Sequence, residues 1–153
     1  QALMEAPEMV ANVHQNFIQS GAQVITTNSY AVVPSHIGKD LFYQRGRELI
    51  SLAAKLARKE ADKTNDSIMV AACVPPVFGS YQPEKFNANK APDLISFFFE
   101  EQDPYVDLFL AETISSIEEA RIILDVYIKF GSTKPLWLAF TLQEFFVETG
   151  FRK

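Results

Sequence analysis

Two kinds of hydrophobic pattern alternate along the chain. Short runs of consecutive apolar residues are typical of strands that are buried on both faces, and they predict strands at residues 23–27, 68–73, 106–111 and 136–140. Between them, apolar residues recur every three or four positions, which predicts amphipathic helices starting at Pro7 and ending at Gly21, and at 45–61, 92–101 and 116–130. Strands that alternate with helices require a parallel sheet with right-handed crossovers. The predicted fold class is therefore α/β.

Four strands leave two architectures open. A closed (β/α)8 barrel needs eight strands and about 250 residues, whereas this chain has 153 residues. The chain is therefore either a small open sheet or the middle portion of a barrel, and we interpret residues 1–153 as one incomplete domain. Because Gln1 is not an initiator methionine and helical sequence begins within a few residues, we expect that the chain was cut from something longer or lacks its first residues.

The segment 106–120 gives the first candidate for chemistry. Its apolar run ends abruptly at Glu112, and Ser115 and Glu118 follow at the spacing of a helix capping box. In parallel α/β folds, ligands bind at the carboxyl ends of the strands. Glu112 is therefore a candidate ligand-binding carboxylate, and a solvated loop acid is the equally good alternative.

The first predicted strand and the helix before it contribute further candidates. Thr27, Asn28 and Tyr30 come at the carboxyl end of that strand, where a pocket is expected. In the preceding helix, His14 lies beside an apolar stripe that includes Val13, and we expect it to be a packed or half-exposed residue rather than a ligand. The stripe, which we expect to be buried, consists of Val10, Val13, Phe17 and Ile18, with His14 beside it.

Composition excludes several classes of function. The net charge is −5 and Lys and Arg form no run, which disfavours nucleic-acid binding. The single cysteine, Cys73, permits neither an internal disulfide nor a complete cysteine-rich zinc site, and fits a reducing cytoplasm. No apolar run approaches the ~20 residues of a membrane helix, and the start has no signal-peptide pattern. We therefore expect a cytoplasmic protein that binds neither nucleic acid nor membrane.

Four segments, taken together and in order, resemble the homocysteine S-methyltransferase family. This family includes the betaine-dependent and S-methylmethionine-dependent enzymes and the homocysteine module of cobalamin-dependent methionine synthase. The resemblance implies a partial (β/α)8 TIM barrel, about strands two to five, with the helices outside a parallel sheet. The tail 144–153 is similar to the family only loosely. The four segments are residues 18–30, 70–83, 110–120 and 137–142.

The resemblance also implies a reaction. The family binds zinc through three cysteine thiolates, and the zinc holds the sulfur of homocysteine as a thiolate, which is a nucleophile at neutral pH. That sulfur takes a methyl group from a sulfonium-type donor, S-methylmethionine or S-adenosylmethionine, and becomes methionine. By the same resemblance, Glu112 holds the amino group of homocysteine, and Asn28, Thr27 and Tyr30 line the pocket. No residue is assigned a catalytic role.

Two departures from the family limit the expected activity. The resemblance places the first strand, with its Asp-Gly-Gly turn, before Gln1 and the zinc cysteines beyond Lys153. Cys73 stands where relatives usually have a small residue such as serine, and it is not at a zinc-ligand position. Zinc is therefore expected for the family, but its ligands are not in this chain, and we expect no methyl transfer from homocysteine and donor by the chain alone.

Two other interpretations remain open at this stage. One is a noncatalytic half-barrel remnant that self-associates as a homo-oligomer, because four parallel strands leave two unpaired edges. The other is an unrelated small α/β binding domain, which would have an open sheet with helices on both faces.

Overall fold

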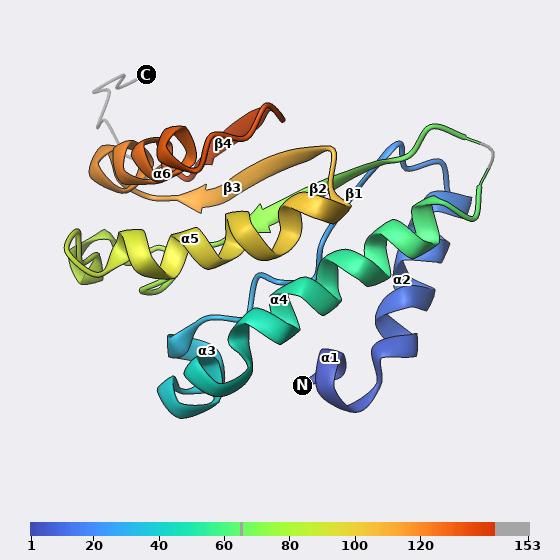
Figure 1. Ribbon diagram of the computed structural model, residues 1–153, viewed down its shortest axis with the longest axis horizontal. Helices are drawn as coiled ribbons and strands as arrows, with labels where there is room; N and C mark the ends of the chain where they lie inside the picture. Colours follow the sequence, from blue (N-terminus) through green and yellow to red (C-terminus); the bar gives the residue numbers. More distant parts are fainter. Residues whose placement is uncertain (65, 143–153) are drawn as a thin grey trace, which may run out of the picture.

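A computed structural model describes residues 1–64 and 66–142, in which four parallel strands form one sheet in the order of the sequence (Figure 1). The α/β alternation predicted from the sequence is confirmed, and each strand lies within two or three residues of its predicted limits. The tail from residue 144 lies outside the described residues. The strands are β1 (Val24–Thr26), β2 (Met69–Val74), β3 (Leu108–Ile114) and β4 (Leu136–Phe140).

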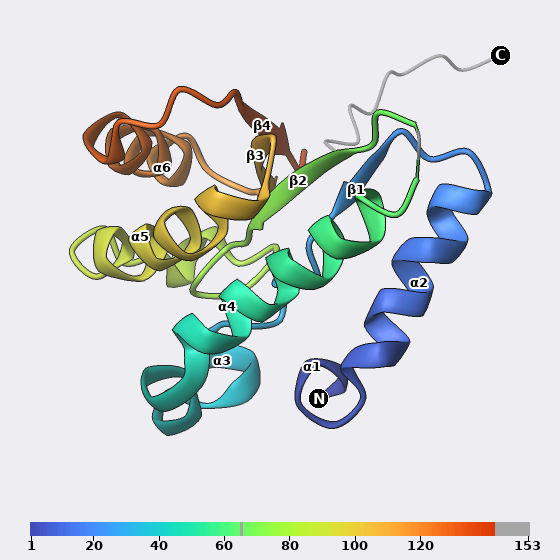
Figure 2. The same cartoon turned by 45° about the vertical axis from the view of Figure 1, so that its right-hand side comes forward.

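The helices cover one side of this sheet (Figure 2). Alternate strand residues, among them Val70, Ala72 and Val74 of β2, turn to the helices and join the main hydrophobic core. An arc with helices on its outer side only is half of a barrel. It is not the open sheet with helices on both faces that an unrelated α/β binding domain would have. The helices are α1 (Ala2–Glu5), α2 (Pro7–Gln19), α3 (Pro34–Ile37), α4 (Lys39–Ala61), α5 (Ala91–Gln102) and α6 (Ile117–Phe130), with short 3-10 helices η1 (Pro83–Lys85) and η2 (Asp103–Tyr105).

Aromatic packing fills the layer between sheet and helices. Phe42, Phe98, Phe99 and Phe109 are completely or almost completely buried. The rings of Phe99 and Phe109 meet edge to face with centroids 4.9 Å apart, which fixes α5 against β3. Such pairs stabilise by about 0.5–1.5 kcal/mol beyond the burial of their area.

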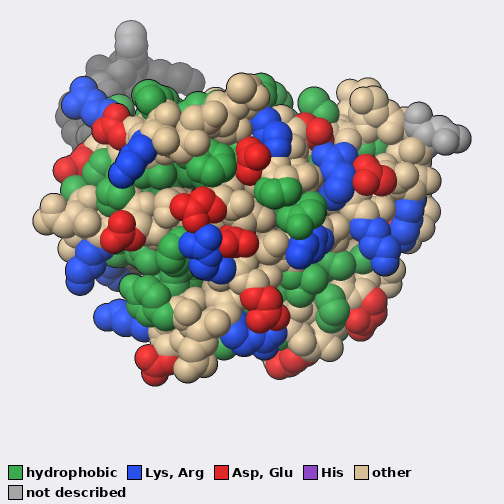
Figure 3. All heavy atoms as spheres, viewed as in Figure 1, with side chains coloured by type: hydrophobic (Ala, Val, Ile, Leu, Met, Phe, Trp, Pro, Cys, Tyr) green, Lys and Arg blue, Asp and Glu red, His purple; other side chains and the backbone are tan. Residues whose placement is uncertain are grey.

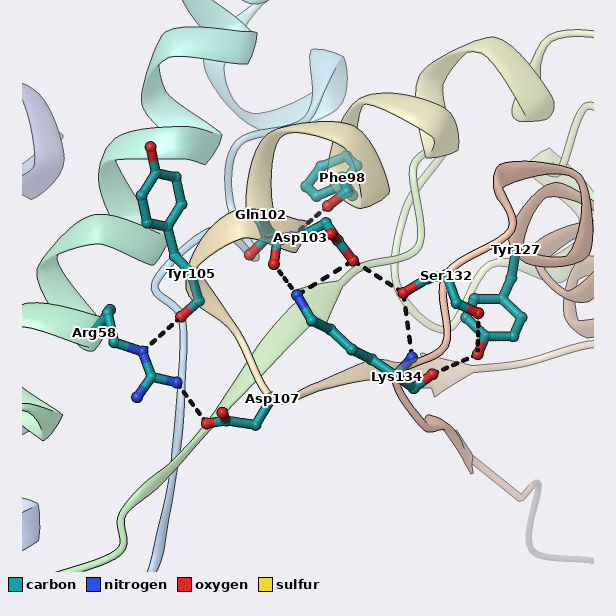
Figure 4. Close-up of polar contacts among 9 residues, drawn as sticks. All are labelled: Arg58, Phe98, Gln102, Asp103, Tyr105, Asp107, Tyr127, Ser132 and Lys134. Atoms are coloured by element: carbon teal, nitrogen blue, oxygen red, sulfur yellow. Dashed lines mark hydrogen bonds and ion pairs between the residues drawn. The ribbon is translucent and has the colours of Figure 1, made fainter.

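Charged contacts fasten the amino-terminal end of the sheet, opposite the end where ligands are expected. Arg58 of α4 pairs with Asp107 at 2.5 Å and donates to the carbonyl oxygen of Tyr105 at 2.9 Å (Figure 4). Asp107 in turn accepts from the backbone N–H of Val70 at 2.7 Å, so one carboxylate joins α4, β2 and the start of β3. Lys134, just before β4, pairs with Asp103 at 3.4 Å (Figure 4). Contacts at this end of a barrel serve stability rather than chemistry.

The expected capping box is displaced by one residue. Ser116, not Ser115, is the N-cap of α6, and its hydroxyl accepts from the backbone N–H of Glu119 at 3.1 Å. The carboxylate of Glu119, not that of Glu118, accepts from the backbone N–H of Ser115 at 3.4 Å. The displacement follows from β3, which continues to Ile114 instead of ending at Ala111 and so delays the start of the helix.

Parts of two helical stripes lie exposed, where the sequence predicted burial. In α2, Val10 is buried, but Val13 and Phe17 are 49% and 61% exposed. In α6, Ile117 and Ile128 are more than half exposed, although Ala120 and Ile123, which share their helical spacing, are buried. A hydrophobic period identifies the apolar face of a helix, but not whether a neighbour covers all of it.

Charged side chains of both signs are mixed on the surface of the molecule. On the face shown in Figure 3, acidic and basic side chains are interspersed, with no broad basic patch. Arg47 of α4 illustrates this mixing, because it bridges to Glu100 and Glu101 of α5 at 2.6 and 2.7 Å. Among the described residues, no helix is both long and apolar enough to cross a membrane.

Candidate functional site

All four residues predicted to bind substrate line one cavity of about 630 Å³. The cavity runs along α2 and β1 and reaches the carboxyl end of β3. It therefore brings Glu112 together with Thr27, Asn28 and Tyr30, although they are more than 80 positions apart in the sequence. The other lining residues are Ala2, Met9, Val10, Val13, His14, Phe17, Val24, Ile25 and Thr26.

A β-bulge sets the position of Glu112 in the cavity. The pairing of β2 with β3 ends where Val74 of β2 meets Ala111 of β3. Glu112 is the next residue of β3 and lies just past this pairing. The register of β3 with β4 then shifts between Ala111 and Ile114, and both of these residues are buried. Thr113, inside the bulge, has a φ of 62°, which is a strained conformation for a β-branched residue. Bulges of this kind redirect side chains, and here the half-buried carboxylate of Glu112 is directed into the cavity.

Asn28 and Tyr30 come from the segment that follows β1. Asn28 is exposed, so its side-chain amide is free to meet a ligand as donor or acceptor. The hydroxyl of Tyr30 lies 2.5 Å from the hydroxyl of Ser80, in the long loop after β2. That contact joins the end of β1 to the loop and fixes one wall of the cavity.

The hydroxyl of Thr27 is directed into the protein interior. It donates to Oε1 of Gln102 at 2.6 Å, accepts from the backbone N–H of Cys73 at 2.9 Å and lies 3.1 Å from the hydroxyl of Ser29. Gln102 also donates to the carbonyl oxygens of Cys73 and Phe98, both at 3.0 Å. This buried network connects β1, β2 and α5 directly beneath the cavity. Thr27 therefore supports the site through its hydroxyl, while other atoms of the residue contribute to the lining.

The described residues do not provide a zinc site. No three His, Cys, Asp or Glu residues among them lie close enough together to hold a metal ion. Cys73 is completely buried, and burial together with the nearby charge of Glu112 raises the pKa of its thiol well above the usual value. A zinc ligand must be a thiolate, so Cys73 is poorly suited to that role.

His14 lines the cavity, whereas the sequence predicted only a packed or half-exposed residue. It is 6% exposed, and its Nε2 finds no hydrogen-bond partner among the described residues. Burial lowers the pKa of His14, and the charge of Glu60 opposes that shift only in part. The side chain therefore favours the neutral form and serves as a packed wall of the cavity.

A second cavity, of about 820 Å³, lies on the flank of the molecule. It is bounded by the start of α4, the loop after β2 and the start of α5, and Lys39, Lys85 and Lys90 contribute to its lining. None of the four predicted site residues lines it.

Sequence reasoning did not identify the support of the site, namely Gln102 and Ser80. Gln102 follows Phe98 by four positions and Phe99 by three, so it is a polar residue on the apolar face of a helix. That placement is a usable signal for a buried hydrogen-bonding group, because such groups are retained only with partners. Ser80 carries no comparable signal in its loop.

The fold and the cavity define an α/β chain with half of a (β/α)8 barrel and a carboxylate at the carboxyl end of its strands. Residues 1–151 match the family model described as homocysteine S-methyltransferase. The chain therefore belongs to the homocysteine S-methyltransferase family. This match confirms the resemblance and excludes the interpretation as an unrelated α/β domain.

Individual relatives are distant and longer. The chain is 23% identical to homocysteine S-methyltransferase 1 of Brassica oleracea var. italica and 25% identical to homocysteine S-methyltransferase of Escherichia coli strain K12. These matches cover 92% and 93% of this chain but 50% of each relative, so the chain spans about half the length of the curated relatives it matches.

Solved structures show the same fold. The oxidized form of the homocysteine methyltransferase MmuM from Escherichia coli superimposes with a TM-score of 0.81 at 23% identity, over 94% of this chain and 54% of that chain. The metallated form of MmuM superimposes with a TM-score of 0.78. The likeness supports the arc of strands as part of a barrel, with helices on the outside.

Proposed function

We propose that this chain supplies the homocysteine-binding part of a homocysteine S-methyltransferase. The observation that carries the proposal is the position of Glu112, a half-buried carboxylate at the strand ends, in a cavity shared with Asn28. Membership of the family adds homocysteine as the substrate to be considered. The longer relatives are named homocysteine S-methyltransferases, and the activity of this chain is our inference from them.

The chemistry of homocysteine fits these groups. Its ammonium pairs with the carboxylate of Glu112 through a charge-assisted hydrogen bond, which is about twice as strong as a neutral one. The amide of Asn28 can donate to the carboxylate of the amino acid. The cavity wall formed by α2 is apolar, which suits the methylene groups of the substrate. The thiol of homocysteine is then free to point toward the methyl donor.

We propose a sulfonium donor, S-methylmethionine or S-adenosylmethionine. The sulfur of homocysteine, having lost its proton, forms a bond to the methyl carbon while the bond from that carbon to the donor sulfur breaks. The donor leaves as a neutral thioether, so its positive charge disappears and no strong acid is required at the leaving group. Zinc would lower the pKa of the thiol when bound. The described residues include no group of three His, Cys, Asp or Glu that could hold a metal ion. We therefore expect the chain alone, given zinc, homocysteine and S-methylmethionine, to form no methionine.

The test of the proposal is the binding of homocysteine, measured by isothermal titration calorimetry. Replacing Glu112 with Gln removes the charge but keeps the shape, and a hydrogen bond to a charged group is worth about 1.5–3 kcal/mol. We expect E112Q to bind at least ~10-fold more weakly than the unchanged chain. The matched control is E118Q, which alters an exposed acid on α6 and should not change the affinity. Equal affinity for E112Q and the unchanged chain would contradict the proposal.

A further inference from the structure

The cavity of about 820 Å³ between α4 and α5 is separate from the proposed homocysteine site. The two helices run side by side, and both begin at the end of the molecule where this cavity lies (Figure 1). Its walls come from the start of α4, the long loop after β2 and the first half of α5. Sites for small molecules typically measure about 300–1,000 Å³. The cavity is therefore large enough to hold an organic ligand.

Three lysines line this cavity. Lys39 begins α4, Lys85 lies in η1 and Lys90 is the N-cap of α5. Asp93 is the one acid among the described residues that line the cavity, and none of the three lysines pairs with a described carboxylate. Three positive charges therefore face one negative charge, in a chain whose net charge is −5. Such a local excess of positive charge attracts anions.

Two of these lysines occupy positions where a cation is unfavourable. The amino-terminal end of a helix carries a partial positive charge, and Lys39 and Lys90 lie at the starts of α4 and α5. Asp40 and Asp93 in the first turns offset this repulsion only in part. Neither helix has a side chain that accepts from its first backbone N–H groups at the N-cap. An anion in the cavity would offset the charges of both lysines, so the lysines and the cavity indicate the same kind of ligand.

Aromatic rings form another part of the lining. Tyr43 of α4 is 70% exposed, although its ring meets that of Phe42 edge to face with centroids 5.7 Å apart. Phe97 of α5 stacks on Phe42 with centroids 6.1 Å apart, and the guanidinium of Arg47 lies 4.6 Å from its ring centre. Phe78, in the loop after β2, also lines the cavity. Rings that are held in place by their neighbours offer surfaces on which a planar group can stack.

We propose that the cavity between α4 and α5 binds a nucleoside phosphate. The lysine ammonium groups pair with the phosphate oxygens, and the base stacks on the aromatic wall that includes Tyr43. Inorganic phosphate would use the lysines alone, and an uncharged nucleoside would use the rings alone. A ligand that carries both an anionic and a planar part is the class that matches the whole lining.

The test is calorimetric titration of the full chain with ADP, adenosine and inorganic pyrophosphate, without homocysteine, so its outcome does not depend on the proposed function. We expect ADP to bind at least ~10-fold more tightly than either of the other two probes, because stacking and charge contribute together. The double variant K39Q/K90Q should weaken ADP binding at least ~5-fold and leave adenosine unchanged. Y43A should weaken ADP and adenosine but not pyrophosphate. The matched control is K59Q, which removes an exposed lysine of α4 outside this lining and should change none of the three affinities.

Three results would overturn this inference. The first is the absence of saturable ADP binding up to a concentration of about 1 mM. The second is pyrophosphate that binds as tightly as ADP, which would reduce the cavity to a site for simple anions. The third is an affinity for ADP that falls no further in K39Q/K90Q than in K59Q, because ADP would then bind elsewhere on the chain.

Discussion

At the scale of single residues, the sequence identified the residues of the site but not the direction in which their side chains point. Thr27 and Asn28 were both predicted to face the pocket, yet Thr27 is only 3% exposed and its hydroxyl donates to Gln102 in a buried network. Neighbouring strand residues face opposite sides. In a strand as short as β1, with three residues, no longer pattern exists to show which side faces the core. The sequence therefore identified the strand end correctly. It did not show that Thr27 is buried beneath the cavity while Asn28 is exposed in it.

The role of Thr27 can be measured directly. T27V keeps the shape of the side chain but leaves the buried N–H of Cys73 without its partner. We expect the free energy of unfolding in urea to fall by about 1–3 kcal/mol, because an unsatisfied buried group costs that much. T133V, at an exposed position, should change it by less than ~0.5 kcal/mol. If the two variants unfold at the same urea concentration, the network does not support the sheet.

At the scale of elements, the sequence predicted which strands and helices exist, but not the residues at which they begin and end. The apolar run predicted β3 correctly, but the bulge at Thr113 extends the strand past Glu112, and no hydrophobic pattern reveals an inserted residue. The same displacement moved the cap of α6 from Ser115 to Ser116, since two adjacent serines are each followed by a glutamate three residues on. Local sequence could not distinguish them, and the end of the strand decided the outcome.

This correction makes a sharp prediction for α6. S116A removes the hydroxyl that accepts from the backbone of Glu119, and loss of an N-cap typically costs about 1 kcal/mol. We expect S116A to lower the free energy of unfolding by that amount and S115A to leave it nearly unchanged. Thermal or urea unfolding of both variants provides the measurement. A larger loss in S115A would show that the capping box begins one residue earlier than in the structure.

At the scale of the whole molecule, strand and helix alternation predicted a parallel sheet, and the family resemblance implied that this sheet is part of a barrel. The observed strand order, the family match and the fold of MmuM agree with both. The sequence did not predict that Val13 and Phe17 would lie exposed. Periodicity marks a face as apolar, but what covers that face depends on neighbours outside the pattern.

The central claim is that the carboxylate of Glu112 recognises the amino group of homocysteine. The most direct test compares homocysteine with 4-mercaptobutanoate, which lacks only that amino group, in the unchanged chain and in E112Q by calorimetry. We expect the unchanged chain to prefer homocysteine by at least ~10-fold and E112Q to lose most of that preference, because the charged hydrogen bond is worth about 1.5–3 kcal/mol. An equal preference in both proteins would contradict the account.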